Sequence, residues 1–133
     1  MAGKPEVIVL EEHFHLPEVN DLYPPADKNT NPALVAQLND LGAGRIAEMD
    51  KHGIDIAVLS HTAPAMQKMD AATAIKAATL ANDRLAEAVR AHPDRFRGFA
   101  VIPTPDPQAA ANELERAVTK LGFVGAMVHG LTN

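Results

Sequence analysis

The sequence predicts an α/β fold in which the strands of a parallel sheet alternate with helices. Short aliphatic runs that suit buried strands cover residues 6–12, 54–60, 98–103 and 123–130. Between these runs lie longer segments that begin with helix caps and carry apolar residues at helical spacing. Connections after the first loop are short, and strands alternating with helices in this way run parallel, joined by right-handed crossovers.

The first predicted strand is followed by a long segment that contains several prolines. Residues 6–12, EVIVLEE, are aliphatic and β-branched and end in two glutamates, as a buried strand does when it delivers side chains to a site. Residues 16–31 contain Pro17, Pro24 and Pro25 among several Asn and Asp residues. This composition predicts an irregular loop with no helix or strand of its own.

Three helices are predicted from their start and stop signals. Each begins at an Asn or Asp cap, two of these caps are followed at once by proline, and each helix stops at a glycine or just before a proline. The predicted spans, caps included, are 31–53, 70–92 and 106–122, the first with a break at the GAG of residues 42–44.

Length and composition limit the function classes. The 133 residues suffice for one domain but fall short of the roughly 250 of an eight-stranded α/β barrel. A net charge of −5 argues against a general affinity for nucleic acid or anionic membrane. Without cysteine, any metal is held by nitrogen and oxygen ligands, and a reducing, cytoplasmic location is expected. We expect neither a signal peptide nor a membrane span.

The polar residues at the end of the first strand are candidate metal ligands. Side chains on a strand alternate between faces, so Glu11, His13 and His15 are expected to share one face. Imidazole nitrogen and carboxylate oxygen suit zinc or manganese, and the carboxyl ends of parallel strands are where sites form in such folds. The motif is common by chance, so the residues alone leave open a metal site or a solvated polar turn.

Two other predicted strands also end near histidine. His61 lies in SHTAP after the second strand, and His129 lies in VHG at the end of the fourth. A single loop histidine most often binds backbone or water, but histidines at three of four strand ends indicate a shared pocket. No glycine-rich phosphate loop, G-x-S-x-G or H-E-x-x-H pattern occurs, so nucleotide binding and serine hydrolysis have no support.

Four stretches of the sequence together resemble one enzyme family. They are LEEHFHLPE, RIAEMDKHGIDIAVLSHTAPAMQ, ANDRLAEAVRAHPDRFRGFAVIPTPDPQAAANELERAV and LGFVGAMVHG. The chain resembles the N-terminal half of the amidohydrolase-related decarboxylases, such as the γ-resorcylate, 2,3-dihydroxybenzoate and 5-carboxyvanillate decarboxylases. The resemblance covers nearly the whole chain except the loop from about residue 19 to residue 39, and its motifs occur in the expected order.

The resemblance implies a distorted (β/α)8 barrel of the TIM type, of which residues 1–133 would be the N-terminal part of one incomplete domain. It implies one divalent ion, zinc or manganese, bound first by Glu11 and His13. More distant relatives use H-x-H, which leaves His13 and His15 as the alternative pair. The resemblance places the remaining ligands, a histidine and an aspartate, and the catalytic acid–base residues outside this chain. The positions expected to bind substrate are His15, His61, Ala63, Pro64 and His129.

The implied activity is metal-dependent, non-oxidative decarboxylation of a small hydroxylated aromatic acid. A metal-dependent hydrolase or lactonase of the same superfamily is the second hypothesis, and true H-x-H ligation would favour it. The third is a catalytically incompetent chain with a structural or assembly role. By resemblance we also expect a homo-oligomer, a dimer or tetramer. Two protein ligands hold an ion poorly, so the 133 residues alone are expected to bind metal weakly and to be inactive.

Overall fold

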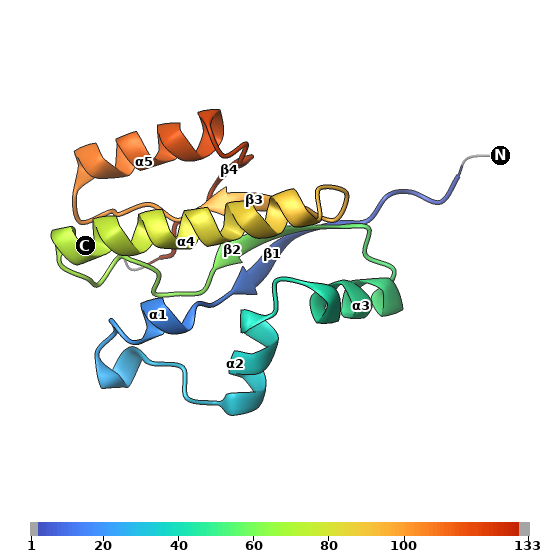
Figure 1. Cartoon of the computed structure of the whole chain (residues 1–133), viewed down its shortest axis with the longest axis horizontal. Coiled ribbons are helices and arrows are strands. Elements are labelled where there is room, and N and C mark those ends of the chain that lie inside the picture. Colours follow the sequence, from blue (N-terminus) through green and yellow to red (C-terminus); the bar gives the residue numbers. More distant parts are fainter. Residues whose placement is uncertain (1–2, 131–133) are drawn as a thin grey trace.

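Four parallel strands form one sheet in the order β1-β2-β3-β4 in the computed structural model, which describes residues 3–130 (Figure 1). The strands are β1 (Ile8–Phe14), β2 (Ile56–His61), β3 (Phe96–Ala100) and β4 (Gly125–Ala126). All three neighbouring pairs are parallel, and each strand pairs with the next in the sequence. The predicted α/β class with a parallel sheet is therefore confirmed.

The strand boundaries differ from the predicted ones by a few residues. β1 lies two residues later than predicted, so His13 is inside the strand and not beyond it. β3 lies earlier, because the backbone N–H of Val101 donates to the Asn82 side chain and not to a neighbouring strand. β4 keeps only two of the eight predicted residues in ladder pairing.

The first predicted helix is two helices, α2 (Pro32–Asn39) and α3 (Ala43–His52). Asp40 ends α2, and its side chain accepts a hydrogen bond from the backbone N–H of Gly42 at 2.8 Å, which turns the chain between the helices. The residues predicted to start and stop this helical region do so in the structure. Asn31 caps α2 through its side chain, and Gly53 closes α3 with a left-handed φ of 69° that favours glycine.

The two later helices agree with the prediction. They are α4 (Ala71–Ala91), capped by Asp70, and α5 (Pro107–Thr119), capped by Asp106. Figure 1 shows α4 alongside β3, α5 next to β4, and α2 beside β1. Most residues that α4 buries are alanines, which let the helix approach the sheet closely. Together with Phe14, Leu59 and Phe96 they form the main core.

The loop prediction for residues 16–31 was wrong in part. This segment contains a short helix α1 (Pro17–Asn20) and a 3₁₀ turn η1 (Pro25–Asp27). Val19 and Tyr23 are buried, and the Tyr23 hydroxyl donates to the carbonyl oxygen of Ala65 at 2.8 Å. Burial raises the pKa of Tyr23 well above its usual value. Val19 and Tyr23 are two isolated buried residues and form no periodic apolar pattern. The composition therefore did not reveal that this segment packs on the core.

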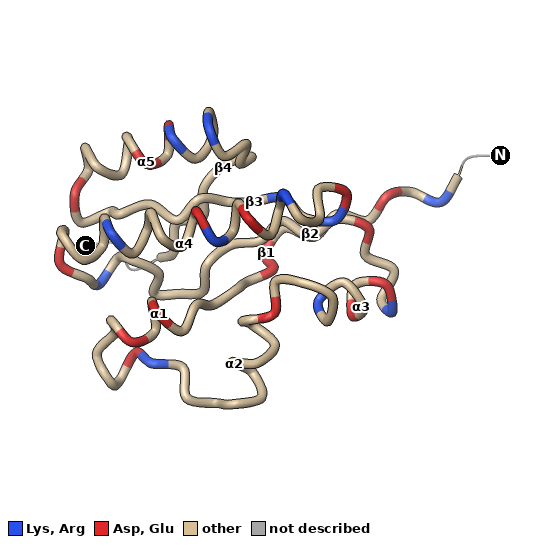
Figure 2. The backbone as a smooth tube through the Cα atoms, viewed as in Figure 1, with Lys and Arg blue, Asp and Glu red and all other residues tan. Residues whose placement is uncertain are grey.

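Charged residues are distributed over the helices and loops. Figure 2 shows acidic and basic positions interleaved along α3, α4 and α5. Within residues 3–130, no helix combines the length and apolar character that a membrane crossing requires.

Candidate functional site

A bulge in β1 precedes its polar end. Val9 pairs with Ala57 and Glu12 with Leu59, so two residues of β1, Leu10 and Glu11, stand opposite one residue of β2. Such bulges redirect side chains and are frequent next to functional sites. Glu11 is exposed, and His13 two residues later is half-buried. That the two side chains share one face stays a prediction from strand alternation.

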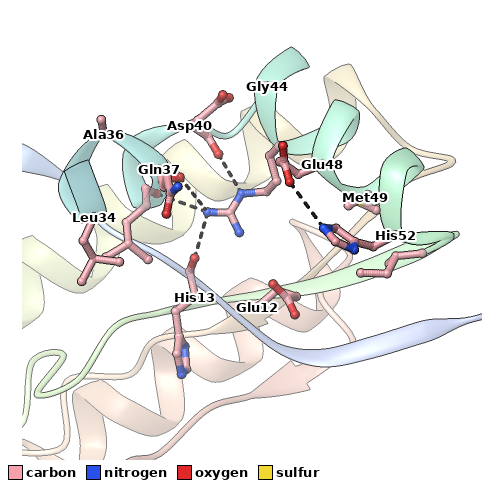
Figure 3. Close-up of a pocket in the computed structure, with 13 residues that line it drawn as sticks. Glu12, His13, Leu34, Ala36, Gln37, Asp40, Gly44, Glu48, Met49 and His52 are labelled. Atoms are coloured by element: carbon pink, nitrogen blue, oxygen red, sulfur yellow. Dashed lines mark hydrogen bonds and ion pairs between the residues drawn. The ribbon is translucent and has the colours of Figure 1, made fainter.

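His13 is held at its ring and at its backbone. Its Nδ1 lies 2.9 Å from the hydroxyl oxygen of Ser60, the residue directly across from it in the β1–β2 ladder. Its carbonyl oxygen accepts from the Arg45 guanidinium at 2.9 Å (Figure 3). The ring is half-buried, and among residues 3–130 its Nε2 has no hydrogen-bond partner. That nitrogen is the atom of His13 that can serve as a ligand.

His15 does not continue this face, in contrast to the expectation from strand alternation. β1 ends at Phe14, and the backbone N–H of His15 donates to the carbonyl oxygen of Leu38 and not to β2. Its Nδ1 lies 3.0 Å from the Asn39 side-chain oxygen, and its ring centroid is 6.2 Å from that of His61. The His15 side chain is 2% exposed. His15 is therefore tied to the end of α2 and to His61.

His61 is a buried, neutral ring at the end of β2. Its Nδ1 lies 3.0 Å from the carbonyl oxygen of Thr62, an atom that only accepts, so Nδ1 carries the proton. Its ring meets the Phe14 ring edge-on, with 5.3 Å between centroids. Burial lowers the pKa of His61 to about 4, so the ring is uncharged at pH 7. The Nε2 atoms of His61 and His15 are both buried and have no hydrogen-bond partner among residues 3–130.

His129 joins the first and fourth strand ends. Its ring centroid lies 5.7 Å from that of His13, and its Nε2 donates to the carbonyl oxygen of His61 at 3.0 Å. The side-chain amide of Gln67 holds the backbone of His129, accepting from its N–H at 2.8 Å and donating to its oxygen at 2.9 Å. The structure thus brings together the histidines that the sequence placed at three strand ends.

The loop after β2 supplies the two remaining predicted positions. The backbone N–H of Thr62 still donates to the Phe14 carbonyl oxygen at 2.9 Å, so the loop leaves the sheet just beyond His61. The bond between Ala63 and Pro64 is cis. Ala63 is exposed and Pro64 is half-buried at this rim. Both residues therefore lie close in sequence and space to His61.

The donor atoms fit part of a site for a divalent ion. Among residues 3–130 no three His, Asp or Glu side chains are grouped closely enough to hold a metal. Glu11 and His13 offer one carboxylate and one imidazole nitrogen, whereas a catalytic zinc site takes three protein ligands. A metal-bound histidine usually donates its other ring N–H to a second group, and the Ser60 hydroxyl can take that role for His13.

A groove of about 750 Å³ runs along β1 beside α2 and α3. Glu12 and His13 contribute to its wall, as do Glu48 and His52, whose side chains lie 3.6 Å apart (Figure 3). Its lining includes none of the described residues Glu11, Ser60 or His129. The groove is therefore not the place where the candidate ligand atoms converge, and we assign no ligand to it.

Three residues that hold the candidate site together were not predicted from the sequence: Ser60, Arg45 and Gln67. Ser60 belongs to β2, so a correct β1–β2 register would have placed it opposite His13. No local pattern marks Arg45 or Gln67, because each acts on a backbone group more than thirty residues away in the sequence.

Comparison with known proteins gives strong matches along the chain. A γ-resorcylate decarboxylase of Rhodococcus jostii strain RHA1 is 48% identical over 134 residues, covering 99% of this chain and 40% of that protein. The structure of a 2,6-dihydroxybenzoate decarboxylase from Rhizobium matches with a TM-score of 0.87 and 43% identity, covering 98% of this chain and 40% of the other.

A dihydroxybenzoic acid decarboxylase from Polaromonas sp. JS666, solved with bound manganese and the inhibitor 2-nitroresorcinol, gives a TM-score of 0.85 at 44% identity. This match covers 98% of the present chain and 40% of that one. The chain thus spans about 40% of the length of these relatives, and its sheet and helices match the first half of their barrel. The sequence profile of the amidohydrolase family matches residues 11–133, so the chain belongs to the amidohydrolase family.

Proposed function

We propose that this chain supplies the first part of the metal site of a decarboxylase that acts on a hydroxylated aromatic carboxylic acid. The proposal is supported by the half-buried His13 at the end of β1, whose Nδ1 lies 2.9 Å from the Ser60 hydroxyl oxygen, and by the exposed Glu11 two residues earlier in the same strand. The relatives support the reaction class, since they are decarboxylases and one of them holds manganese. They do not favour the hydrolase or the purely structural hypothesis.

Glu11 and His13 are the proposed ligand pair, in preference to His13 and His15. The exposed Glu11 lies two residues before His13 in β1, so strand alternation supports a common face for the two side chains. His15 instead bonds Asn39 through Nδ1, and its Nε2 is buried. We propose manganese as the ion, because a relative binds it and because a carboxylate and an imidazole suit it.

The ion would act as Lewis acid and template for the substrate carboxylate and its neighbouring hydroxyl. Around it, Ala63 and His129 reach the rim, where they would contact the aromatic ring or its substituents. Pro64 would shape the same edge. His15 and His61, only 2% and 1% exposed, would act from beneath this rim.

We further propose that residues 1–133 belong to a single barrel domain whose other ligands and acid–base groups lie outside this chain. The chain by itself is then expected to bind Mn²⁺ weakly and to release no carbon dioxide from 2,6-dihydroxybenzoate. Measured turnover by the purified 133-residue chain would contradict this division of the site. The expected homo-oligomer and cytoplasmic location stay predictions.

The ligand assignment is tested by titrating Mn²⁺ into the parent chain and into Glu11→Gln, His13→Ala and His15→Ala variants. Glu115→Gln is the matched control, because it neutralises an exposed carboxylate on α5. We expect Glu11→Gln and His13→Ala each to weaken binding at least tenfold, with His15→Ala and the control unchanged. If Mn²⁺ affinity is lost in His15→Ala and retained in Glu11→Gln, the ligand pair is His13 and His15.

A further inference from the structure

The ring of His13 has one side-chain hydrogen-bond partner among the described residues, the hydroxyl of Ser60 at 2.9 Å from Nδ1. Ser60 is fully buried in β2, which is paired with β1 on one side and with β3 on the other. The hydroxyl is therefore fixed in position by the sheet. We propose that Ser60 is a positioning residue that sets the tautomer of His13, an inference that rests on the proposed function.

The hydrogen bond can run in two directions with opposite consequences. A serine hydroxyl can donate or accept. If the Ser60 hydroxyl donates to Nδ1, then Nε2 of the neutral His13 ring carries the proton and has no lone pair for an ion. If the hydroxyl accepts from Nδ1–H, then Nε2 is bare and can bind a metal. Because the proposed function needs a bare Nε2 on His13, the inference is that Ser60 accepts and keeps His13 in the second form.

The geometry around His13 leaves Ser60 as the group that orients the ring. The carbonyl oxygen of His13 is held by Arg45, which fixes the backbone but not the ring. His129 lies beside the ring at 5.7 Å between centroids, and its Nε2 is engaged by the carbonyl oxygen of His61. Since a ligand histidine depends on its second hydrogen bond for orientation and basicity, loss of the Ser60 hydroxyl is expected to weaken metal binding.

The test compares Ser60→Ala with the parent chain by two measurements. Long-range ¹H–¹⁵N spectra of the metal-free protein report which nitrogen of His13 carries the proton, a property that a merely structural role would not move. We expect Nδ1–H in the parent and a shift of the population toward Nε2–H in Ser60→Ala. Mn²⁺ titration should show affinity lowered about 10–100-fold in Ser60→Ala.

Two further variants serve as controls. Thr104→Val removes a different buried hydroxyl, which has no hydrogen-bond partner in the part of the chain that the structure describes, so it should alter neither readout. Ser60→Thr keeps a hydroxyl and should restore Nδ1–H in His13. A His13 ring found as Nε2–H in the parent, or an unchanged tautomer or affinity in Ser60→Ala, would overturn the inference.

The same experiment separates this inference from the proposed function. If His13→Ala leaves Mn²⁺ affinity unchanged, then His13 is no ligand and the proposed function itself fails. If His13→Ala lowers the affinity while Ser60→Ala does not, only the role of Ser60 is refuted. Loss of affinity in both variants, together with the tautomer shift, supports both proposals.

Discussion

The two flanks of the sheet are held by different means. On the β3 side, α4 buries eight residues and α5 buries three. On the β1 side, α2 buries none, α3 buries only Met49, and Leu10 of β1 is 57% exposed. The β3 flank thus rests on buried contacts, whereas partly exposed hydrogen bonds such as that of Arg45 to the His13 carbonyl oxygen hold the β1 flank. Stability and the candidate site are therefore expected to respond to different substitutions.

The largest effect should follow from Asn82→Ala on the packed flank. The Asn82 amide bonds both the N–H and the carbonyl oxygen of Val101, at 3.0 and 2.9 Å, and donates to Glu113 at 2.7 Å. Removing it leaves these buried groups without that partner, so the free energy of unfolding should fall by about 3–5 kcal/mol. Denaturant titration measures this.

Asn112→Ala is the control for that substitution, because Asn112 is exposed on α5 and bonds only the Gln108 side chain. It should change the unfolding free energy by less than about 0.5 kcal/mol. Equal losses in the two variants would show that the packed flank does not depend on the buried amide.

The second effect is a pH dependence that originates at the rim. Burial lowers the pKa of His61 to about 4, whereas an unfolded histidine titrates near 6.5. Between these values the unfolded chain binds the extra proton, so acid favours unfolding. As pH falls from about 6.5 to 4, His61 alone should remove about 3 kcal/mol of stability. Unfolding curves of the parent and of His61→Leu, measured at pH 7 and at pH 4.5, check this. The variant should lose less unfolding free energy between the two pH values than the parent does.

How far the sequence predicted the fold also differs between the flanks. The α4 and α5 spans followed from the caps Asp70 and Asp106 and from helical spacing, and the structure agrees within about two residues at each end. The α1 segment did not follow, because Val19 and Tyr23 are fixed by distant partners such as Ala65. Local signals specify helices well and long-range packing poorly.

For the candidate site, strand-end placement predicted the gathering of His13, His61 and His129. It did not predict that His15 turns toward Asn39, because that depends on where β1 stops pairing with β2. The bulge at Leu10 and Glu11 was equally invisible, since it exists only in the register between two strands. The residue types of a site can thus be inferred from one segment, but their orientation requires its neighbour.

A smaller loss of stability is expected when the helix N-cap side chains of the two flanks are removed. The Asp106 side chain accepts from the N–H of Ala109 at 2.9 Å, and Asn31 accepts from those of Ala33 and Leu34. Asp106→Ala should lower the free energy of global unfolding by about 1 kcal/mol. Asn31→Ala should lower it less, because α2 buries no residue and can fray without opening the core.

Hydrogen exchange distinguishes those two outcomes. In Asn31→Ala the amides of α2 should exchange faster while those of α4 keep their protection. In Asp106→Ala protection should fall throughout the core. A global loss of protection in Asn31→Ala would mean that α2 unfolds together with the rest of the chain.

The smallest expected change in stability is at the candidate ligand itself. Glu11 is exposed and lies on the open face of β1, so Glu11→Gln should alter the unfolding free energy of the metal-free chain by no more than about 0.5 kcal/mol. The same variant is expected to lose Mn²⁺ affinity, which would show that the residue serves binding and not folding. A loss of stability above about 1 kcal/mol would instead mean that Glu11 supports the bulge, since a surface carboxylate without a structural role has no means of producing it.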